Sequence, residues 1–222
     1  MIETSINGVF KDNGKLFTEN LPDCKGLKVY DEKLIVYNNR EYRSWNPYKS
    51  KLAAAILNGL KEINLFEGAN VLYLGAATGT TVSHISDIIR DQGIIYAVEI
   101  SPYAIKQLSR VCENRKNIIP ILADANRLEE YENIVSKPVD LVYQDISQRN
   151  QTEIFIKNVK KFLDEKGQGI LMIKARSINV SDEPKRIYDS VVKKLKEVDL
   201  KIKYKIDLSP YAKDHVAIVV NL

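Results

Sequence analysis

The feature that most constrains the fold is an alternation of apolar, β-branched stretches with amphipathic stretches through most of the chain. Near-continuous apolar strands separated by helices are typical of a parallel sheet that is covered on both faces. We therefore expect an α/β fold. The expected strands are residues 71–75, 94–100, 118–124, 139–145 and 168–175, and the expected helices are residues 81–90, 102–115, 128–136 (short and weak), 151–163 and 182–198.

The last two apolar stretches, residues 201–209 and 215–220, have no helix between them and are joined by SPYAKD. Parallel neighbours need a crossover of about a dozen residues, whereas a hairpin needs only a short loop. The last strand is therefore expected to run antiparallel. A parallel sheet that ends in a hairpin is the layout of the class I S-adenosylmethionine-dependent methyltransferase fold, a Rossmann-like seven-stranded sheet in which the first five strands take the order 3-2-1-4-5.

The first part of the chain has a different pattern. Turn signals at Asn7-Gly8, Asn13-Gly14 and Asn38-Asn39 separate short stretches such as LKVY and KLIVY. This pattern predicts a small N-terminal β module at residues 1–48, followed by the methyltransferase domain at residues 49–222. The segment SKLAAAILNGLKEI, which begins with a Ser in N-cap position, predicts a helix at the start of that domain.

Composition excludes several classes of protein. The 222 residues contain 45% hydrophobic and 28% charged residues, without an apolar run of membrane-spanning length. The N-terminus does not resemble a signal peptide, so we expect a cytoplasmic location and no membrane partner. Cys24 and Cys112 lack the spacing of metal ligands, and no metal site is expected. The net charge of +4 permits nucleic-acid binding but is too small to argue for it.

The turn VLYLGAATGTT, residues 71–81, indicates a ligand site between a strand and a helix. A dinucleotide fold needs G-x-G-x-x-G, but the later two positions counted from Gly75 are Ala77 and Thr80. A P-loop needs a Lys after its second Gly, and no Lys follows Gly79. S-adenosylmethionine has no phosphate, and it needs a close backbone approach that Gly75 and Gly79 allow.

Acidic residues follow the next two expected strands. Glu99 lies about twenty residues after the Gly turn, where an acid can bind ribose hydroxyls. Asp124 ends the third strand, where a carboxylate can accept a hydrogen bond from an adenine amine. A lone acid at a strand end is more simply a capping or solvated carboxylate. The Gly turn and both acids at three successive strand ends together favour an adenosyl ligand.

The candidate catalytic residues lie at the ends of the following strands. Asp145 and Lys174 end neighbouring strands in the expected order, so we expect them side by side beside the methyl donor. His215 begins the antiparallel last strand and should face the same crevice. Such a cluster suits removal of a proton from an alcohol. The alternative is a Lys that snorkels to solvent beside a nearby acid. His84, inside the first helix after the turn, is interpreted as structural.

Several stretches of the sequence resemble a known family. VLYLGAATGTTVSHISDII, YAVEIS and NIIPILADA are similar to fibrillarin, particularly to the shorter archaeal fibrillarin-like proteins, as are EYRSWNPYKSKLAAAILNGL and SPYAKDHVAIVV. The resemblance covers about residues 28–222. It implies transfer of a methyl group from S-adenosylmethionine to ribose 2′-hydroxyls of rRNA and tRNA, within a box C/D small ribonucleoprotein that serves pre-rRNA and tRNA processing.

The resemblance also implies residues and partners. The implied catalytic residues are Lys51, Asp145, Lys174 and His215. With the Gly turn included, the expected cofactor-binding residues are Gly75, Ala77, Gly79, Thr80, Thr81, Glu99, Ile100, Asp124, Ala125, Asp145, Ile146, Ser147 and Gln148. The implied partners are a Nop-type scaffold protein, a kink-turn-binding ribosomal-type protein, a box C/D guide RNA, and the target rRNA or tRNA.

Three further interpretations of the residues stay open. Arg176, Lys185 and Arg186 are candidates for RNA binding, although charges on helices are usually a solvated face. A chain of this kind could also serve as a non-enzymatic assembly subunit that keeps the fold. It could instead be a methyltransferase that acts on protein or on a small molecule, which a requirement for guide RNA would distinguish.

Overall fold

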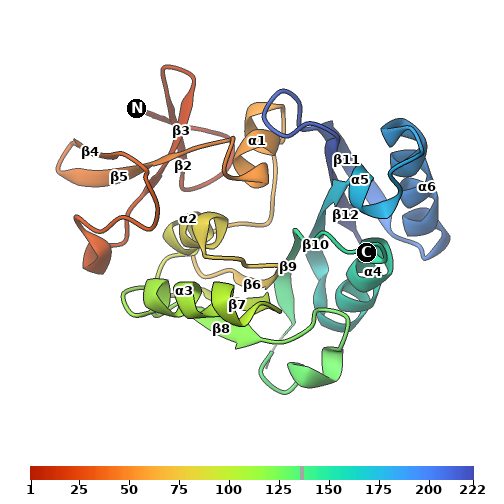
Figure 1. Cartoon of the computed structure of the whole chain (residues 1–222). Helices are drawn as coiled ribbons and strands as arrows, with labels where there is room; N and C mark the ends of the chain where they lie inside the picture. The colour runs from red at the N-terminus through yellow and green to blue at the C-terminus, as the bar shows by residue number, and fades with distance from the viewer. Residues whose placement is uncertain (136–137) are drawn as a thin grey trace.

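A seven-stranded sheet forms the centre of the molecule in the computed structural model, which describes residues 1–135 and 138–222 (Figure 1). The order β11-β12-β10-β9-β6-β7-β8 confirms the 3-2-1-4-5 arrangement and the class I methyltransferase topology. β12 is antiparallel to both of its neighbours, as expected. The strands are β6 (Asn70–Leu74), β7 (Ile94–Glu99), β8 (Ile118–Leu122), β9 (Val139–Gln144), β10 (Leu163–Lys174), β11 (Lys201–Asp207) and β12 (His215–Asn221).

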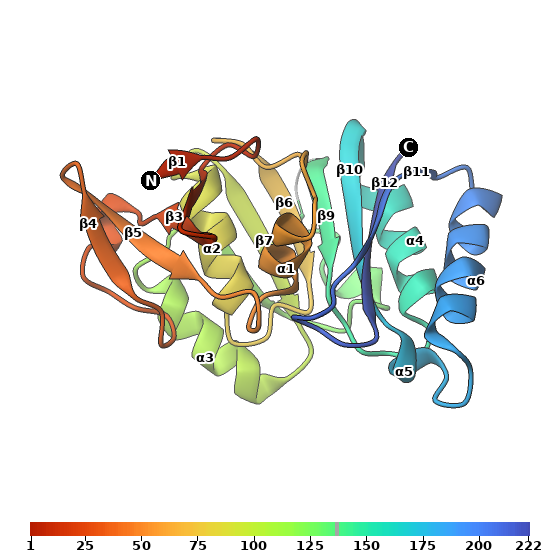
Figure 2. The ribbon, with the colours of Figure 1, turned by 90° about the horizontal axis from the view of Figure 1, so that it is seen from above.

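Helices cover both faces of this sheet, as Figure 2 shows. Successive side chains of a strand point to opposite faces. In β6, Val71 and Tyr73 accordingly belong to one hydrophobic cluster, and Leu72 and Leu74 belong to the other. The first face is covered by α1 (Lys51–Leu57), α2 (Thr80–Ile89) and α3 (Pro102–Cys112), and the second by α4 (Gln151–Phe162) and α6 (Pro184–Glu197).

The N-terminal segment forms a second, antiparallel sheet in the order β1-β2-β3-β5-β4. Asn13 and Gly14 take positive φ at the β2–β3 turn, and Asn38 and Asn39 do so at the β4–β5 turn, as tight hairpins require. The elements are β1 (Ile2–Glu3), β2 (Val9–Asp12), β3 (Lys15–Glu19), the 3₁₀-helix η1 (Pro22–Cys24), β4 (Leu34–Tyr37) and β5 (Arg40–Trp45).

The expectation that LKVY adds a strand to this sheet was wrong. Residues 27–30 lie outside the strands. The backbone N–H groups of Val29 and Tyr30 donate to the carboxylate of Glu32 instead of to a neighbouring strand. A side chain two to three residues away therefore satisfies the backbone donors that a strand partner would otherwise have taken.

Several element boundaries also differ from expectation. The helix expected at residues 50–63 ends at Leu57, because Gly59 takes a φ of 111° soon after. The last helix begins at Pro184 with Glu183 as its N-cap, two residues after the expected start at residue 182. Within the weak helix expected at residues 128–136, a 3₁₀-helix, η2 (Leu128–Glu130), forms; residue 136 lies outside the described residues.

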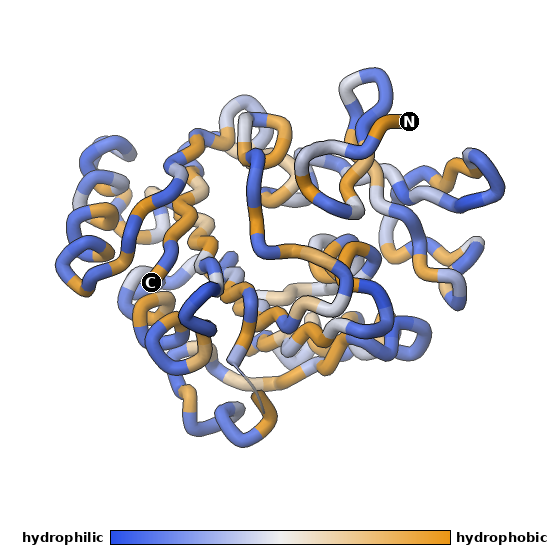
Figure 3. The backbone as a smooth tube through the Cα atoms, turned by 180° about the vertical axis from the view of Figure 1, so that it is seen from behind, coloured by the Kyte–Doolittle hydropathy of each residue, from blue (hydrophilic) through white to orange (hydrophobic). Residues whose placement is uncertain are grey.

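β10 begins earlier than expected and is followed by an element that the sequence did not predict. It starts at Leu163, directly after α4, and its pairing with β9 shifts register before Gln168. The short helix α5 (Ala175–Ile178) follows β10 at once. Among residues 1–135 and 138–222, no helix is long and apolar enough to cross a membrane. Figure 3 shows hydrophobic stretches along the central strands and alternation along α6.

The two sheets share buried side chains. Val9, Leu16 and Trp45 of the N-terminal sheet belong to the same hydrophobic cluster as Val82 and Ile85 of α2. Because one core serves both sheets, the N-terminal strands are held firmly against the central seven-stranded sheet. The division into residues 1–48 and 49–222 stays a prediction.

Candidate active site

An ion pair between Lys51 and Asp145 lies at the carboxyl edge of the central sheet. The Nζ atom of Lys51 donates to Oδ1 of Asp145 at 2.7 Å and to Oδ2 at 2.9 Å. Asp145 directly follows β9, and Lys51 is the first residue of α1, so the pair joins two elements that lie 94 positions apart in the chain. Both side chains keep part of their surface exposed, 27% for Lys51 and 19% for Asp145. The carboxylate therefore stays accessible to a substrate.

Lys174 and His215 are paired in register on the adjacent antiparallel strands β10 and β12, which confirms the expected meeting of these two strand ends. The expected neighbour of Asp145 was Lys174, but Asp145 forms its ion pair with Lys51 instead. β9 and β10 align Gln144 with Leu171, which leaves Lys174 two residues farther along the sheet than Asp145. Within the described residues the ammonium of Lys174 forms no ion pair.

The environment of His215 favours the neutral form of its ring. Its Nδ1 atom lies 2.7 Å from the carbonyl oxygen of Lys213, an arrangement that suits an Nδ1–H donor and leaves Nε2 as an acceptor. Burial lowers the pKa of His215, and the nearby ammonium groups of Lys51 and Lys174 act in the same direction. A neutral imidazole with a free acceptor nitrogen can take a proton.

The Gly turn brings β6 close to its neighbours. Gly75 has a φ of +85°, and a Cβ atom there would lie less than 3.0 Å from the carbonyl oxygen of Asp145 and from the Ile146 side chain. At Gly79, with a φ of +96°, a Cβ atom would meet Leu108 of α3. The sequence predicted that a ligand uses the space at both glycines. The structure shows that neighbouring parts of the chain already use that space.

A cavity of about 260 Å³ opens beside this turn. Its wall includes the carboxylate of Glu99, the side chain of Ile100, which is 55% exposed, and residues 145–148. Oε2 of Glu99 accepts from the N–H of Ala77, and Oε1 accepts from the N–H of Ser101, so the carboxylate fixes the turn. Each carboxylate oxygen has further acceptor capacity for a ligand hydroxyl.

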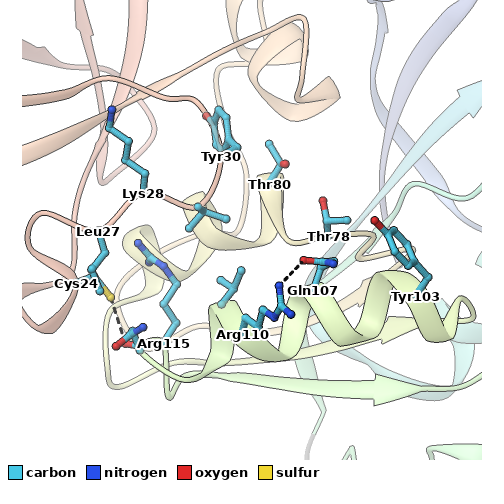
Figure 4. A pocket seen from close by; sticks show the side chains of 13 residues that line it. Cys24, Leu27, Lys28, Tyr30, Thr78, Thr80, Tyr103, Gln107, Arg110 and Arg115 are labelled. Atoms are coloured by element: carbon cyan, nitrogen blue, oxygen red, sulfur yellow. Dashed lines mark hydrogen bonds between the residues drawn. The ribbon is translucent and has the colours of Figure 1, made fainter.

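Most of the expected cofactor residues line this cavity, but four do not. The lining residues among those expected are Gly75, Ala77, Glu99, Ile100, Ala125, Asp145, Ile146, Ser147 and Gln148. Asp124 is not among them; its Oδ1 accepts from the N–H of Asn126 in a local turn. Gly79 faces Leu108 of α3, Thr80 borders a different cavity (Figure 4), and the Thr81 hydroxyl donates to Ser50 at 3.0 Å.

Three residues that sequence reasoning missed contribute to the site. Val98 and Ala123 line the cavity at the ends of β7 and β8, where strand-end position was an available signal. Ser50 accepts from the N–H of Ala53 as the N-cap of α1, besides accepting from Thr81. It thereby connects the start of α2 to the residue next to Lys51. Its contact with Thr81 had no signal in the sequence, because 31 positions separate the two residues.

The RNA-binding candidates lie near the same edge on α5 and α6. Arg176 donates from Nε to Asp214 at 3.3 Å and from Nη1 to the carbonyl oxygen of Val180, so its guanidinium already has protein partners. Lys185 and Arg186 are exposed in the first turns of α6. Their roles stay predictions. His84, by contrast, is fully buried and contacts Thr18 and Tyr30, in agreement with its structural interpretation.

The sequence of this chain is similar to those of known proteins. The family model described as fibrillarin matches residues 2–222. The chain is 51% identical over 195 residues to the fibrillarin-like rRNA/tRNA 2′-O-methyltransferase of Methanocaldococcus jannaschii, covering 88% of this chain and 84% of that protein.

Two solved structures have the same fold over nearly the whole chain. The first is Aeropyrum pernix fibrillarin in complex with natively bound S-adenosyl-L-methionine, at a TM-score of 0.86 and 40% identity, covering 99% of this chain and 100% of that one. The second is the fibrillarin of a fibrillarin/Nop5p complex, at a TM-score of 0.86 and 43% identity, covering 99% of each chain.

Proposed function

The chain belongs to the fibrillarin family, and from that premise we propose that it transfers methyl groups from S-adenosylmethionine to ribose 2′-hydroxyls of rRNA and tRNA. The observation that carries the proposal is the Lys51–Asp145 ion pair beside the cavity at the Gly turn. A partly exposed carboxylate next to a methyl-donor site suits alignment and deprotonation of an alcohol.

The cavity fits the adenosyl group of the cofactor. Ile100 and Ile146 offer apolar surface for a flat ring, and Glu99 offers acceptors for ribose hydroxyls. Gly75 and Ala77 bring the backbone of the turn to the same cavity. When bound, the cofactor supplies an electrophilic methyl group on its sulfonium.

The chain's own residues then handle the acceptor hydroxyl. Asp145 accepts the hydrogen bond of the ribose 2′-hydroxyl and takes its proton as the new O–CH₃ bond forms and the S–CH₃ bond breaks. Lys51 holds the carboxylate in a fixed direction through its two hydrogen bonds. His215, held neutral by burial, offers Nε2 as a proton acceptor at the same edge. Lys174 supplies positive charge beside it for an RNA phosphate.

The proposed setting is a box C/D ribonucleoprotein. The solved fibrillarin/Nop5p complex supports a Nop-type scaffold protein as a direct partner. A guide RNA and a kink-turn-binding ribosomal-type protein complete the particle in this proposal. Selection of the target nucleotide by base pairing with the guide agrees with the modest net charge of +4, because the chain then needs only weak contacts with the RNA backbone.

The decisive variant is Asp145→Asn, which keeps the size of the side chain and removes its charge. In a guide-loaded particle with labelled S-adenosylmethionine, we expect transfer to the target ribose to fall by about a hundredfold or more. For Asp145→Ala, we expect transfer to the target ribose to fall at least as far. Asp91→Asn is the matched control, because Asp91 is exposed in the loop between α2 and β7, at the other end of the sheet.

Two readouts separate this proposal from the alternatives. If the Asp145→Asn particle transferred as much label to the target ribose as the wild-type particle does, Asp145 would have no part in the chemical step. Label that appears in protein or in small molecules without guide RNA would support a different methyltransferase. If a thermal-shift titration showed no stabilisation of the wild-type chain by S-adenosylmethionine, the role of a non-enzymatic assembly subunit would be favoured.

A further inference from the structure

The loop between β9 and α4 contains both Asp145 and one wall of the cavity beside the Gly turn. It runs from Gln144, the last residue of β9, to Gln151, the first residue of α4, and residues 145–148 line the cavity. The N–H of Asp145 donates to the carbonyl oxygen of Leu74 at 2.9 Å, and after this bond the loop leaves the sheet. The shape of the loop therefore depends on contacts outside the sheet ladder.

Two fully buried glutamines brace this loop. Nε2 of Gln144 donates to the carbonyl oxygen of Gln151 at 2.6 Å and so closes the base of the loop. Nε2 of Gln151 donates to the carbonyl oxygen of Gln148 at 2.9 Å and so ties the cavity wall to the start of α4. Both glutamine residues are 0% exposed, so bulk water cannot replace either bond. Together the two bonds connect the end of β9, through the start of α4, to the wall of the cavity.

Neither acceptor needs the amide that bonds it. The carbonyl oxygen of Gln148 already accepts from the backbone N–H of Gln151 at 3.2 Å. The carbonyl oxygen of Gln151 belongs to the first residue of α4 and takes part in the hydrogen bonds of the helix itself. The side-chain bonds of the two glutamines therefore fix the directions of carbonyl groups that have donors without them.

The two glutamines also weaken the fold. Their Oε1 atoms are buried, and within residues 1–135 and 138–222 neither accepts a hydrogen bond from the protein. A buried acceptor without a donor destabilises the folded state, and an apolar side chain of the same length would fill the space without that cost. Polar residues that reduce stability are expected where the position of a functional loop matters more than stability.

We propose that Gln144 and Gln151 are positioning residues, whose amides hold residues 145–148 in the shape that presents Asp145 to the acceptor hydroxyl and the cavity wall to the cofactor. Neither glutamine lines the cavity, so both act through the loop. The inference rests on the proposed methyl transfer, and it identifies what sets the geometry of the site on the side of β9.

The test uses Gln144→Met and Gln151→Met, each of which removes the donor and the unpaired oxygen and keeps the length of the side chain. In calorimetric titrations of the full chain without RNA, we expect the Kd for S-adenosylmethionine to rise about five- to tenfold. In the guide-loaded particle at saturating cofactor, kcat should fall about tenfold while the KM for target RNA is kept. The midpoint of urea unfolding should equal or exceed that of wild type.

The double variant Gln144→Met/Gln151→Met tests whether the two amides act on the same loop. If they do, its losses of cofactor affinity and of kcat should be little larger than those of the more damaged single variant. If the losses of the single variants multiplied in the double variant, the two amides would act independently and the proposed brace would be wrong.

The matched control is Asn117→Leu, which removes a buried amide just before β8, away from the carboxyl edge of the sheet. Nδ2 of Asn117 donates to the carbonyl oxygens of Ser86 and Arg90, and Oδ1 accepts from the Ser86 hydroxyl at 2.7 Å. Because this amide is fully paired, the control should lose stability and keep both cofactor affinity and kcat. If Gln144→Met behaved in the same way, Gln144 would be structural and the proposal would be overturned.

Failure of the proposed function gives a different pattern. If the wild-type particle transferred no label while both methionine variants still weakened the binding of S-adenosylmethionine, the brace would stand and methyl transfer to RNA would be refuted. If the wild-type particle transferred label and both variants matched its Kd and kcat, the brace alone would be refuted.

Discussion

At the scale of single residues, Gly75 links backbone geometry to the catalytic carboxylate. Its φ of +85° is costly for residues with a side chain, and a Cβ atom would overlap the backbone of Asp145. The two strands approach so closely here because the turn lacks this one atom. The position of Asp145, and with it the ion pair to Lys51, therefore depends on a glycine one strand away.

We predict that Gly75→Ala is more damaging than Gly14→Ala, although both positions have similar positive φ values. Gly14 has open space where a Cβ atom would be, so only backbone strain of about 1 kcal/mol is expected there. At Gly75 the overlap adds about 1–3 kcal/mol and displaces Asp145. Urea unfolding and methyl-transfer assays check both effects. Equal losses of stability in the two variants would contradict the steric argument.

The residues of the site differ in how far the sequence could reveal them. Asp145, Lys174 and His215 were predictable because the ends of neighbouring strands in this topology meet at one edge. The partner of Asp145 was not, since Lys51 reaches it from α1, 94 positions earlier in the chain. Only the resemblance to a family pointed to Lys51.

At the scale of elements, the short helix α1 begins with Lys51. The Ser50 side chain caps this helix and also accepts a hydrogen bond from Thr81, the second residue of α2. A seven-residue helix has little stability of its own, so its direction depends on such contacts. Ser50 thus fixes the start of α1 relative to the Gly turn.

Ser50→Ala is expected to lower the free energy of unfolding by about 1 kcal/mol through the lost cap, and to lower kcat because Lys51 is less well held. Ser101→Ala is the matched control: Ser101 caps α3 in the same way, accepting from the N–H of Ala104. Its stability loss should be similar, with kcat kept at saturating cofactor. Equal kcat values for Ser50→Ala and wild type would show that the cap does not position Lys51.

Element prediction succeeded where hydrophobic periodicity alone decides the structure. The central strands are buried on both faces, so their apolar runs identify them from sequence. Prediction failed at residues 27–30, where the Glu32 carboxylate takes the backbone donors, and at the start of β10, where the pairing with β9 shifts register. Hydrogen bonds to a side chain, or to a neighbouring strand, leave no periodic pattern in the local sequence.

At the scale of the whole molecule, a buried ionic cluster joins the two sheets. Arg43 of β5 bonds Glu32 at 2.6 Å and Asp87 of α2 at 2.9 Å, and Arg115 bonds the other oxygen of Asp87. All four side chains are almost completely buried. The cluster holds β5, and therefore α1 six residues later, in a fixed position against α2.

We expect Arg43→Met to lower the free energy of unfolding by about 3–5 kcal/mol, because it leaves Glu32 buried without its cation. The double variant Arg43→Met/Glu32→Gln should recover part of this loss, since it removes the unpaired charge and the single amide oxygen can still accept from one of the two N–H groups, of Val29 or of Tyr30, that bond the carboxylate. Denaturant titrations of the two variants measure both values. A double variant no more stable than Arg43→Met would contradict the role of the unpaired charge.

The same cluster makes stability depend on pH through His84. Burial, aided by the guanidinium groups of Arg43 and Arg115, lowers the pKa of His84 well below its ordinary value of 6.5. Below pH 6.5 the unfolded chain therefore binds a proton that the folded chain refuses, so the stability present above that pH is lost as the pH falls. Between pH 7 and pH 5 we expect His84 alone to remove about 2 kcal/mol.

This window separates His84 from the carboxylates, because the pKa of Glu32 is lowered from an ordinary value of 4.5 and its contribution is lost only in more acidic solution. His215, whose pKa burial also lowers, acts in the same direction but is half-exposed and screened. Urea titrations at pH 7 and pH 5 on wild type, His84→Gln and His215→Gln resolve the two. His84→Gln should have the flattest profile, since it removes the only fully buried imidazole in the chain. If wild type and His84→Gln lost equal stability between pH 7 and pH 5, the unfavourable protonation of the buried ring could not be the cause.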